Sequence, residues 1–368
     1  MSVTGHNPVS QETTASIRDV ARAAGVSYQT VSRVINDHPN VSPQAKEKVN
    51  DAIAALGYRP SRAARALANG VDRAVTVLTS NTRLYGYAET LGGIEEAARS
   101  AGVQVSIRVL ESDSPEHVAA AVEGVSDPRA GAVIVLAFDR AGARALQALP
   151  ANVSTSAAAE SYLGRRAPVS ESAQWAWFDD TLAAQHATEH LLALGHETVH
   201  HLAIPSTTSV GDRQRGWKRA LLSANASVPD VVRPRSWSTA GAHEAAMRLL
   251  LDPAVTAILC GNDDQALGVI RAAHDLGISV PADLSVVGFD DVPTARFYTP
   301  ALTTVRFDFA ALGARAFELL GFAPAGEAPL AEPTLIVRES TGPAPSRRTA
   351  VSPGRRPRAG TQEKKDDR

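Results

Sequence analysis

Three polar side chains are spaced so that they could read the edges of DNA base pairs. Tyr28, Gln29 and Arg33 lie close together, and Gln29 and Arg33 are four residues apart, which is one helical turn. Glutamine can form two hydrogen bonds with adenine N6 and N7, and arginine can do the same with guanine O6 and N7. The pattern predicts contact with bases in the major groove. Further DNA contacts are expected from nearby polar residues, Ser16, Ser27, Thr30, Ser32 and Asn36.

Adjacent aspartates occur three times and could suggest acid and base catalysis. The pairs are Asp179/Asp180, Asp263/Asp264 and Asp290/Asp291. Neighbouring side chains in an extended segment point to opposite sides, whereas glycoside hydrolysis needs two carboxyl groups that flank one bond. We therefore expect no catalysis from these pairs, and we interpret the protein as a non-enzyme.

Histidines are concentrated in one stretch, and two of them have the spacing of metal ligands. His186 and His190 are four residues apart, and His196, His200 and His201 follow. No His-Glu-x-x-His motif accompanies them, and no glycine-rich phosphate-binding loop occurs in the chain. We expect neither a metal nor a cofactor, and we interpret these histidines as solvated or packed side chains.

Two short helices joined by a glycine turn must position the base-reading side chains. Ser16 and Asp19 have the spacing of a capping box, which predicts a helix over 17–24 that ends at Gly25. Ser27 then caps a second helix. The two helices can share an apolar face made of Val20, Ala21, Val26, Val31, Val34 and Ile35. This pattern is typical of a helix-turn-helix, whose second helix enters the major groove.

A third helix strengthens that interpretation, because any amphipathic helix pair has some polar face. Ser42 and Pro43 mark its start and Gly57 its end. We therefore place a DNA-binding domain at 16–60, after a polar arm at 1–15 that we expect to be disordered. The alanine-rich segment 61–70 has good helix propensity but is too short to be a stable helix alone.

Apolar runs alternate with helical stretches from residue 73 onward. The runs are 74–78, 103–107, 132–136, 199–203 and 257–260, and a crossover helix is expected to include 94–101. Continuous apolar strands between helices predict parallel sheets covered on both faces. Ser80, Asn262 and Asp290 follow strand ends, which is where ligands bind in such sheets.

Composition indicates a globular protein of the cell interior. The 368 residues are 44% hydrophobic and 21% charged, with one cysteine and no apolar run long enough for a membrane span. The polar N-terminus lacks the apolar core of a signal peptide, so we expect a cytoplasmic location. The net charge of −2 conceals basic ends, because residues 1–70 carry +3 and residues 342–368 carry +5, leaving −10 between them.

Several motifs resemble those of the lac repressor (LacI/GalR) family of sugar-responsive transcription regulators. The resemblance spans about 16–342. Its motifs, in the family's order, are 24–34 (AGVSYQTVSRV), 57–60 (GYRP), 189–196 (EHLLALGH), 262–268 (NDDQALG), 285–291 (SVVGFDD) and 302–305 (LTTV). The resemblance implies an all-α helix-turn-helix headpiece plus a hinge helix at 61–70. An α/β core of two doubly wound lobes, like that of periplasmic binding proteins, is implied at 73–342.

The resemblance also implies an effector site between the lobes. Arg213 matches the family's ligand-binding arginine by its spacing to Gly216, and Asn262 and Asp290 match two hydroxyl-binding positions. Other matched contacts are Ser80, Leu84, Ser209, Trp237 and Phe309, although Trp237 and Phe309 could equally be core residues.

One further sugar-binding carboxylate has no direct match in the chain. Leu182 stands at its position unless a small gap brings Asp180 or Asp179 there, and Trp177 lies nearby as an additional ring. Phe307 replaces a polar residue of the family. A galactoside is a plausible effector on these matches.

By the same resemblance, two headpieces of a homodimer bind a near-palindromic operator, and Leu67 of the hinge inserts into its minor groove. A sugar in the cleft is expected to release the operator, so the chain would repress sugar-utilisation genes. Residues 343–368 are rich in Pro, Ser and Arg and contain no leucine, so we expect a disordered tail and a dimer rather than a tetramer. The alternative is a sugar-binding receptor or a sugar-processing enzyme.

Overall fold

The computed structural model describes residues 15–35, 41–58, 74–159, 174–204, 212–234, 237–323 and 330–346. The chain divides into two units, Met1–Asp72 and Arg73–Arg368. Several predictions lie outside the described residues: the arm at 1–14, the hinge helix at 61–70 with Leu67, Asn36, Ser209, and the tail after residue 346.

Three helices lie in the described part of the first unit, and their ends are those that the capping residues predict. Helix α1 is Ile17–Ala24, α2 is Tyr28–Ile35 and α3 is Pro43–Leu56. The capping box is present: Ser16 Oγ accepts from the Asp19 N–H at 3.4 Å, and Asp19 Oδ2 accepts from the Ser16 N–H at 2.9 Å. Gly25 ends α1 with a φ of 63°, a conformation that favours glycine.

A small apolar core holds these three helices together. Val20, Val31 and Val49, one from each helix, are fully buried, and Val34 and Tyr58 are buried beside them. The predicted apolar face is therefore the observed one, with Val26 and Ile35 only partly buried at its margin. The opposite face of α2 stays exposed.

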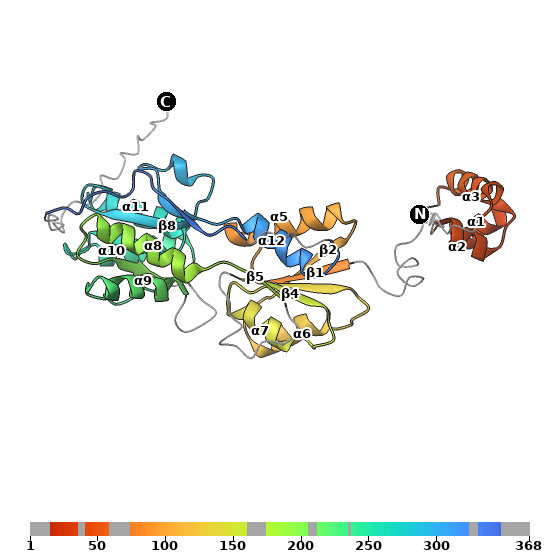
Figure 1. Cartoon of the computed structure of the whole chain (residues 1–368), viewed down its shortest axis with the longest axis horizontal. Coiled ribbons are helices and arrows are strands. Elements are labelled where there is room, and N and C mark those ends of the chain that lie inside the picture. The colour runs from red at the N-terminus through yellow and green to blue at the C-terminus, as the bar shows by residue number, and fades with distance from the viewer. Residues whose placement is uncertain are drawn as a thin grey trace, which may run out of the picture. The chain divides into compact units, whose positions relative to one another are not determined.

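The first lobe of the second unit is a five-stranded parallel sheet between two helical layers. The strands are β1 (Ala74–Thr79), β2 (Gln104–Val109), β3 (Ala132–Leu136), β4 (Thr155–Ala159) and β5 (Gln174–Trp177), in the order β2-β1-β3-β4-β5. Helices α6 (Pro115–Glu123) and α7 (Arg140–Ala148) cover one face, and α5 (Tyr85–Ser100) and α12 (Phe309–Glu318) cover the other (Figure 1).

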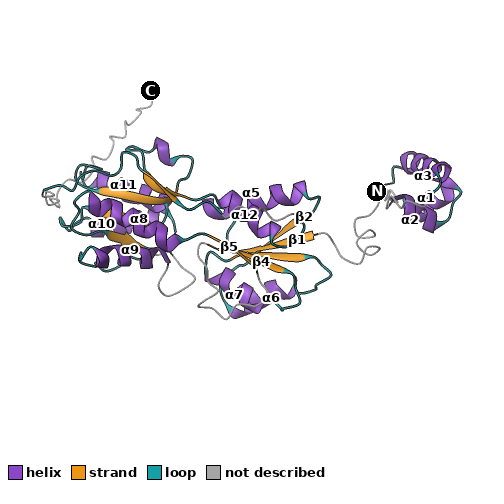
Figure 2. Cartoon of the chain, viewed as in Figure 1, coloured by secondary structure: helices purple, strands orange, loops and turns teal. Residues whose placement is uncertain are grey.

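The second lobe contains the other five-stranded sheet. Its order is β10-β9-β8-β7-β6, formed by Thr334–Ile336, Thr303–Arg306, Ser285–Asp290, Ala257–Cys260 and His200–Leu202. Helices α8 (Asp180–Ala193), α9 (Asp212–Ser223), α10 (Thr239–Leu249) and α11 (Asp263–Asp275) complete this layered lobe (Figure 2). β10 runs antiparallel to β9 at the edge of the sheet. We did not predict β4, β5, β9 or β10, which are three to five residues long and include Thr, Ser, Gln or Arg.

The chain passes between the lobes more than once, so each lobe is built from separate stretches of sequence. β5 of the first lobe leads into α8 of the second, and β9 of the second leads back into α12. Helix α12 packs against α5 so closely that a Cβ on Gly93 would lie 2.0 Å from the Ala310 carbonyl oxygen. Small residues on α5 therefore allow α12 to complete the first lobe.

Two further features concern the chain ends and the longest helices. The Ala344 N–H donates to the Leu194 carbonyl at 2.8 Å, so the chain is still packed beyond the predicted end of the core at residue 342. Among the described helices, none is long and apolar enough to cross a membrane.

Candidate functional sites

The exposed face of α2 carries the residues predicted to read bases. Tyr28 is 54% exposed, Gln29 and Arg33 are exposed, and Thr30 and Ser32 are half-buried. Gln29 and Arg33 lie one turn apart on the same side of the helix. A tyrosine and two long polar side chains on one short helix form a surface suited to base edges in a groove.

Serines stand at the starts of the first two helices. Ser27 Oγ accepts from the Thr30 N–H at 3.1 Å and lies 2.9 Å from Thr30 Oγ1, so Ser27 caps α2 as predicted. Ser16 caps α1 and is exposed. Helix N-termini attract anions because their N–H groups and the helix dipole both present partial positive charge. Both starts are suited to contact DNA phosphates.

A small cavity opens between the two lobes, at the carboxyl ends of the parallel strands. Its walls come from Leu84, Tyr85, Gly86, Tyr87 and Phe138 of the first lobe, and from Arg213, Trp237, Asn262, Asp264, Asp290 and Val292 of the second. Its volume is about 20 Å³, which is enough for about one water molecule. A sugar could enter only if the lobes or their side chains moved apart.

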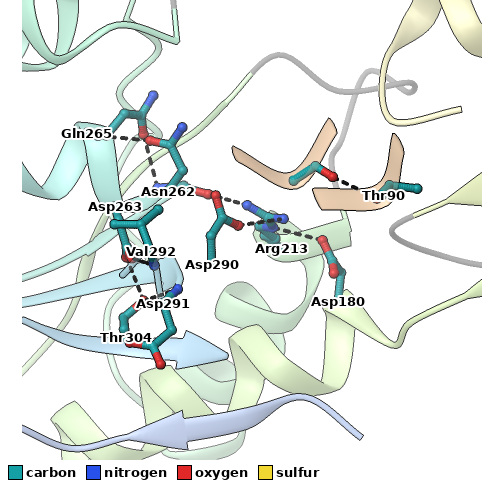
Figure 3. A network of polar contacts seen from close by, with 12 residues as sticks. Thr90, Asp180, Arg213, Asn262, Asp263, Gln265, Asp290, Asp291, Val292 and Thr304 are labelled. Atoms are coloured by element: carbon teal, nitrogen blue, oxygen red, sulfur yellow. Dashed lines mark hydrogen bonds and ion pairs between the residues drawn. The ribbon is translucent and has the colours of Figure 1, made fainter. Parts of the chain in front are cut away.

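Arg213 is the central charge of this cavity. It lies in the first turn of α9 and is only 4% exposed. Its Nε donates to Asp180 Oδ2 at 2.8 Å, one of its terminal nitrogens donates to the Gly261 carbonyl, and the other lies 3.9 Å from Asp290 Oδ1. Figure 3 shows the guanidinium between the two carboxylates. The hydrogen bonds to Asp180 and Gly261 therefore hold the guanidinium in one orientation.

Asn262 and Asp290 approach Arg213 from the ends of two strands. Asn262 follows β7 and caps α11, because its Oδ1 accepts from the Gln265 N–H at 2.8 Å. Asp290 ends β8 with a φ of 106°. Burial raises the pKa of Asp290 well above its usual value and Arg213 opposes that rise. Carboxylate, amide and guanidinium groups together can bind neighbouring sugar hydroxyls, which both donate and accept.

Asp180, rather than Asp179, supplies the carboxylate beside Arg213. Asp179 is turned to the start of α8, where its Oδ1 accepts from the Leu182 N–H at 2.8 Å. Asp179 and Trp177 instead line a separate cavity of about 390 Å³, together with Trp175, Leu182, His186, Arg315 and other residues. The structure therefore does not bring Trp177 or Asp179 to Arg213, because the α8 cap divides the two aspartates between opposite sides.

Phe307 and Phe309 form the packed base of the cavity and do not line it. Both are buried, at 6% and 2% exposure, and their rings stack with centroids 5.4 Å apart. Phe307 also stacks on Phe289, and the Arg213 guanidinium carbon lies 4.6 Å from the Phe289 ring centre. The Arg213 guanidinium thus packs against the faces of the Phe289 and Phe307 rings, which accounts for an aromatic residue at position 307.

Ser80, Leu84 and Trp237 lie at or beside the cavity. Leu84 and Trp237 line it, while the Ser80 hydroxyl donates to Asp139 and lies 3.2 Å from the Tyr87 hydroxyl. Lining residues that we missed are Tyr85, Gly86, Tyr87, Phe138, Asp264 and Val292. Phe138 lies just after β3, so the strand-end argument could have found it.

The aspartate pairs do not form acid and base partners. Asp263 accepts from Thr304 and Val292, whereas Asp264 lines the cavity. Asp290 faces Arg213, whereas Asp291 accepts from Arg306 at 2.7 Å and from Arg338 at 2.6 Å. Neighbouring carboxylates thus point apart, but the extended backbone that we assumed is not the reason, because two pairs lie at helix starts and Asp290/Asp291 lie in a turn with positive φ.

Three of the histidines belong to the packing of the second lobe, whereas His186 is exposed. His196 lies 2.9 Å from the Thr256 hydroxyl and 3.0 Å from the Ser285 hydroxyl, and His190 lies 3.1 Å from that of Thr341. His201 is buried, and burial lowers its pKa to about 4. Within the part of the chain that the structure describes, no cluster of His, Cys, Asp and Glu is arranged to hold a metal ion.

Two family models match the chain. Residues 16–61 match bacterial regulatory proteins of the lacI family, and residues 188–341 match a periplasmic binding protein-like domain. These are the segments that contain α1 to α3 and most of the second lobe.

Known proteins resemble the chain over nearly its whole length. It is 35% identical to the lactose operon repressor of Escherichia coli K12, over 90% of this chain and 92% of that protein. It is 33% identical to the regulator GalS of Salmonella typhimurium, over 88% and 96% of the two chains.

Solved structures agree in fold. The lac repressor dimer bound to operator and the anti-inducer ONPF matches with a TM-score of 0.78 and 32% identity, over 89% of this chain and 99% of that one. The regulator CelR in complex with cellobiose matches with a TM-score of 0.61 and 27% identity, over the same two shares. The chain therefore belongs to the LacI family of bacterial regulatory proteins.

Proposed function

We propose that this regulator represses sugar-utilisation genes as a homodimer that leaves its operator when a sugar binds between the lobes. Membership of the LacI family makes it a DNA-binding transcriptional regulator. The further steps, which concern the sugar, the operator and the sign of the response, are our proposal. We expect it to act in the cytoplasm, where operator DNA is found.

The observation that carries the proposal is the arrangement around Arg213. A buried arginine between Asp180 and Asp290, with Asn262 beside it, offers donors and acceptors of the kind that adjacent hydroxyl groups require. Leu84, Tyr85 and Phe138 form an opposing wall on the other lobe. A bound sugar would therefore contact both lobes and respond to their arrangement.

A galactoside is the first candidate for the effector. The lactose operon repressor is a relative at 35% identity, and the positions of Arg213, Asn262 and Asp290 match that family's hydroxyl contacts. The CelR complex contains cellobiose, so a glucoside is the main competitor. Relatives named PurR also match, at 31% identity. A ligand panel should therefore also include compounds other than sugars.

In the proposed mechanism, sugar and operator favour different arrangements of the two lobes, so each weakens the binding of the other. Two headpieces place α2 in successive major grooves of a near-palindrome, and the hinge segments with Leu67 order between them. The cavity of about 20 Å³ must enlarge to admit a sugar. If the enlarged state binds DNA less well, the coupling is reciprocal and typically amounts to ~1–3 kcal/mol.

The alternative is a sugar-binding receptor or a sugar-processing enzyme. The relatives above are transcriptional regulators, and the aspartate pairs of this chain diverge rather than flank a shared substrate position. We propose that the chain is not an enzyme. Incubation with aryl glycosides, followed for release of the aryl alcohol, should show no turnover.

A ligand screen combined with a DNA titration tests the proposal. Thermal shift against mono- and disaccharides should raise the melting temperature for a small set of sugars, because ligands that bind the folded state stabilise it. Fluorescence anisotropy should show tighter binding to a palindrome of the lac-operator type than to a scrambled duplex at the same salt. Equal affinity for both duplexes would contradict the proposal.

A further inference from the structure

The turn after β8 holds Asp290 in a conformation that a free chain would avoid. Asp290 has a φ of 106° and Asp291 has a φ of 51°. Residues with side chains rarely adopt positive φ, and they keep it only where the surrounding structure holds them there. The direction of the Asp290 carboxylate therefore depends on whatever fixes this turn.

Asp263 is a main anchor of the turn. Its Oδ2 accepts from the Val292 N–H at 2.9 Å, and its Oδ1 accepts from the Thr304 hydroxyl at 2.6 Å. Thr304 Oγ1 in turn accepts from the Asp291 N–H at 3.4 Å, a weak bond. Figure 3 shows the Asp263 carboxylate next to Val292 and Thr304 and away from Arg213. Asp263 thus connects α11, β9 and the residues that follow Asp290.

The surroundings of Asp263 are shaped for its carboxylate. A Cβ on Gly288 would lie 2.1 Å from Asp263 Oδ1, so only glycine leaves room on β8. Asp263 is fully buried, and no ion pair to it occurs among the described residues. The Arg338 guanidinium pairs with Asp291 instead. Burying a carboxylate beside neutral donors alone is costly, which points to a role beyond packing.

Asp263 also follows Asn262 directly in the chain. Asn262 lines the cavity, and Asp263 does not. Two consecutive residues therefore have different roles: Asn262 faces the cavity, and Asp263 holds the turn that carries Asp290. We propose that Asp263 is a positioning residue of the effector site, which holds this turn so that the Asp290 carboxylate faces the same cavity as Asn262. This inference rests on the proposed function, because it gives Asp263 a part in sugar binding.

Three variants separate this role from packing. Asp263→Asn keeps the size of the side chain but replaces one carboxylate oxygen with an NH2 group, which would face the Val292 N–H or the Thr304 hydroxyl, both of them donors. Thr304→Val keeps the shape of Thr304 but removes the hydroxyl, and it remains informative if Asp263→Asn fails to fold. Thr304→Ser keeps the hydroxyl and is the matched control. Circular dichroism and melting curves establish that each variant is folded.

Hydrogen exchange without ligand tests whether Asp263 holds the turn. Amides of 288–294 should exchange at least ~10-fold faster in Asp263→Asn and Thr304→Val than in the wild type. Thr304→Ser should match the wild type, and amides of 74–79 should be unchanged in all variants. Unchanged exchange at 288–294 in Asp263→Asn would overturn the inference.

Calorimetric titration with methyl β-galactoside, or with the sugar that the thermal screen identifies, tests the consequence. Asp263→Asn should weaken binding about 10–100-fold, the loss that removal of a supporting hydrogen bond causes at metal sites. The double variant with Asp290→Asn should bind no more weakly than Asp290→Asn alone, because Asp263 acts through Asp290. Additive losses would overturn the positioning role. A wild-type protein that binds no sugar would instead contradict the proposed function, while the exchange rates still report on the turn.

Discussion

Arg213 shows at the scale of one residue why this cavity is suited to a ligand. Three charges are buried together in Arg213, Asp180 and Asp290, and burial alone would disfavour each of them. The two aspartates face the arginine from separate elements, α8 and β8. Asp290 lies at 3.9 Å from Arg213, which is longer than a hydrogen bond. A sugar hydroxyl could therefore donate to Asp290 without breaking a strong ion pair.

Arg33 should determine one base pair of the operator. Arg33→Ala is expected to lose about 1–3 kcal/mol of binding energy at a single guanine and to relax the preference there. Its exposure on α2 leaves the guanidinium available for such a contact. Anisotropy titrations with operators changed one base pair at a time measure this. An equal loss with every duplex would mean that Arg33 contacts phosphate only.

His201 should make the second lobe sensitive to acid. Its pKa of about 4 in the folded protein lies below the usual value of 6.5. Unfolded chains therefore bind a proton that the folded chain rejects, so this histidine's contribution to stability is lost as the pH falls below about 6.5. The effect should reach about 2 kcal/mol at pH 5.

Comparison with His201→Gln isolates that effect. Asp263, whose pKa burial raises to about 7, changes stability in the opposite direction over the same pH range, but it is present in both proteins. Urea unfolding at pH 7.5 and pH 5 should therefore show that acidification changes the stability of the wild type less favourably than that of His201→Gln, by about 2 kcal/mol. The same pH dependence in the two proteins would rule out His201 as the source.

Among the helices and strands, local sequence signals were sufficient to predict the helix ends of the headpiece but not the placement of side chains in the cleft. Ser16, Ser27 and Gly25 set helix ends through contacts within a few residues, so the sequence predicted those ends. The strands β1, β2, β3, β6 and β7 were also predictable from their apolar runs, whereas β4, β5 and β9 were not predicted. The split of Asp179 from Asp180 depends on where α8 begins relative to α9, a contact between distant residues. Such long-range placement is not encoded in spacing alone.

The contact between α5 and α12 can be tested with two neighbouring glycines. A Cβ on Gly93 would lie 2.0 Å from the Ala310 carbonyl, while one on Gly92 would meet nothing within 4 Å. Gly93→Ala should therefore reduce the free energy of unfolding by about 1–3 kcal/mol through overpacking. Gly92→Ala should raise it by up to ~1 kcal/mol, because alanine favours helix. Chemical denaturation of both variants measures the difference, and equal effects would argue against close packing at Gly93.

For the whole molecule, charge and assembly bear on DNA binding. Residues 1–70 carry a net charge of +3, whereas the chain as a whole carries −2. One weakly basic headpiece offers few phosphate contacts, and two headpieces on one dimer double them. Binding to the operator should therefore depend on dimerisation.

Light scattering coupled to size exclusion should find a dimer. The expected mass is twice the chain mass of 38.6 kDa, because residues 343–368 contain no leucine with which to build a coiled coil between dimers. A stable mass of four chains would contradict the expected assembly.

The coupling between cleft and operator is tested most directly by measuring operator affinity against sugar concentration, for the wild type and for Arg213→Ala. The wild-type affinity should fall by about 5–150-fold at saturating sugar, the range of a coupling energy of ~1–3 kcal/mol. Arg213→Ala, shown by its melting curve to be folded, should bind operator as the wild type does and should not respond to sugar. A wild-type operator affinity that no sugar changes, or a full response in Arg213→Ala, would contradict the account.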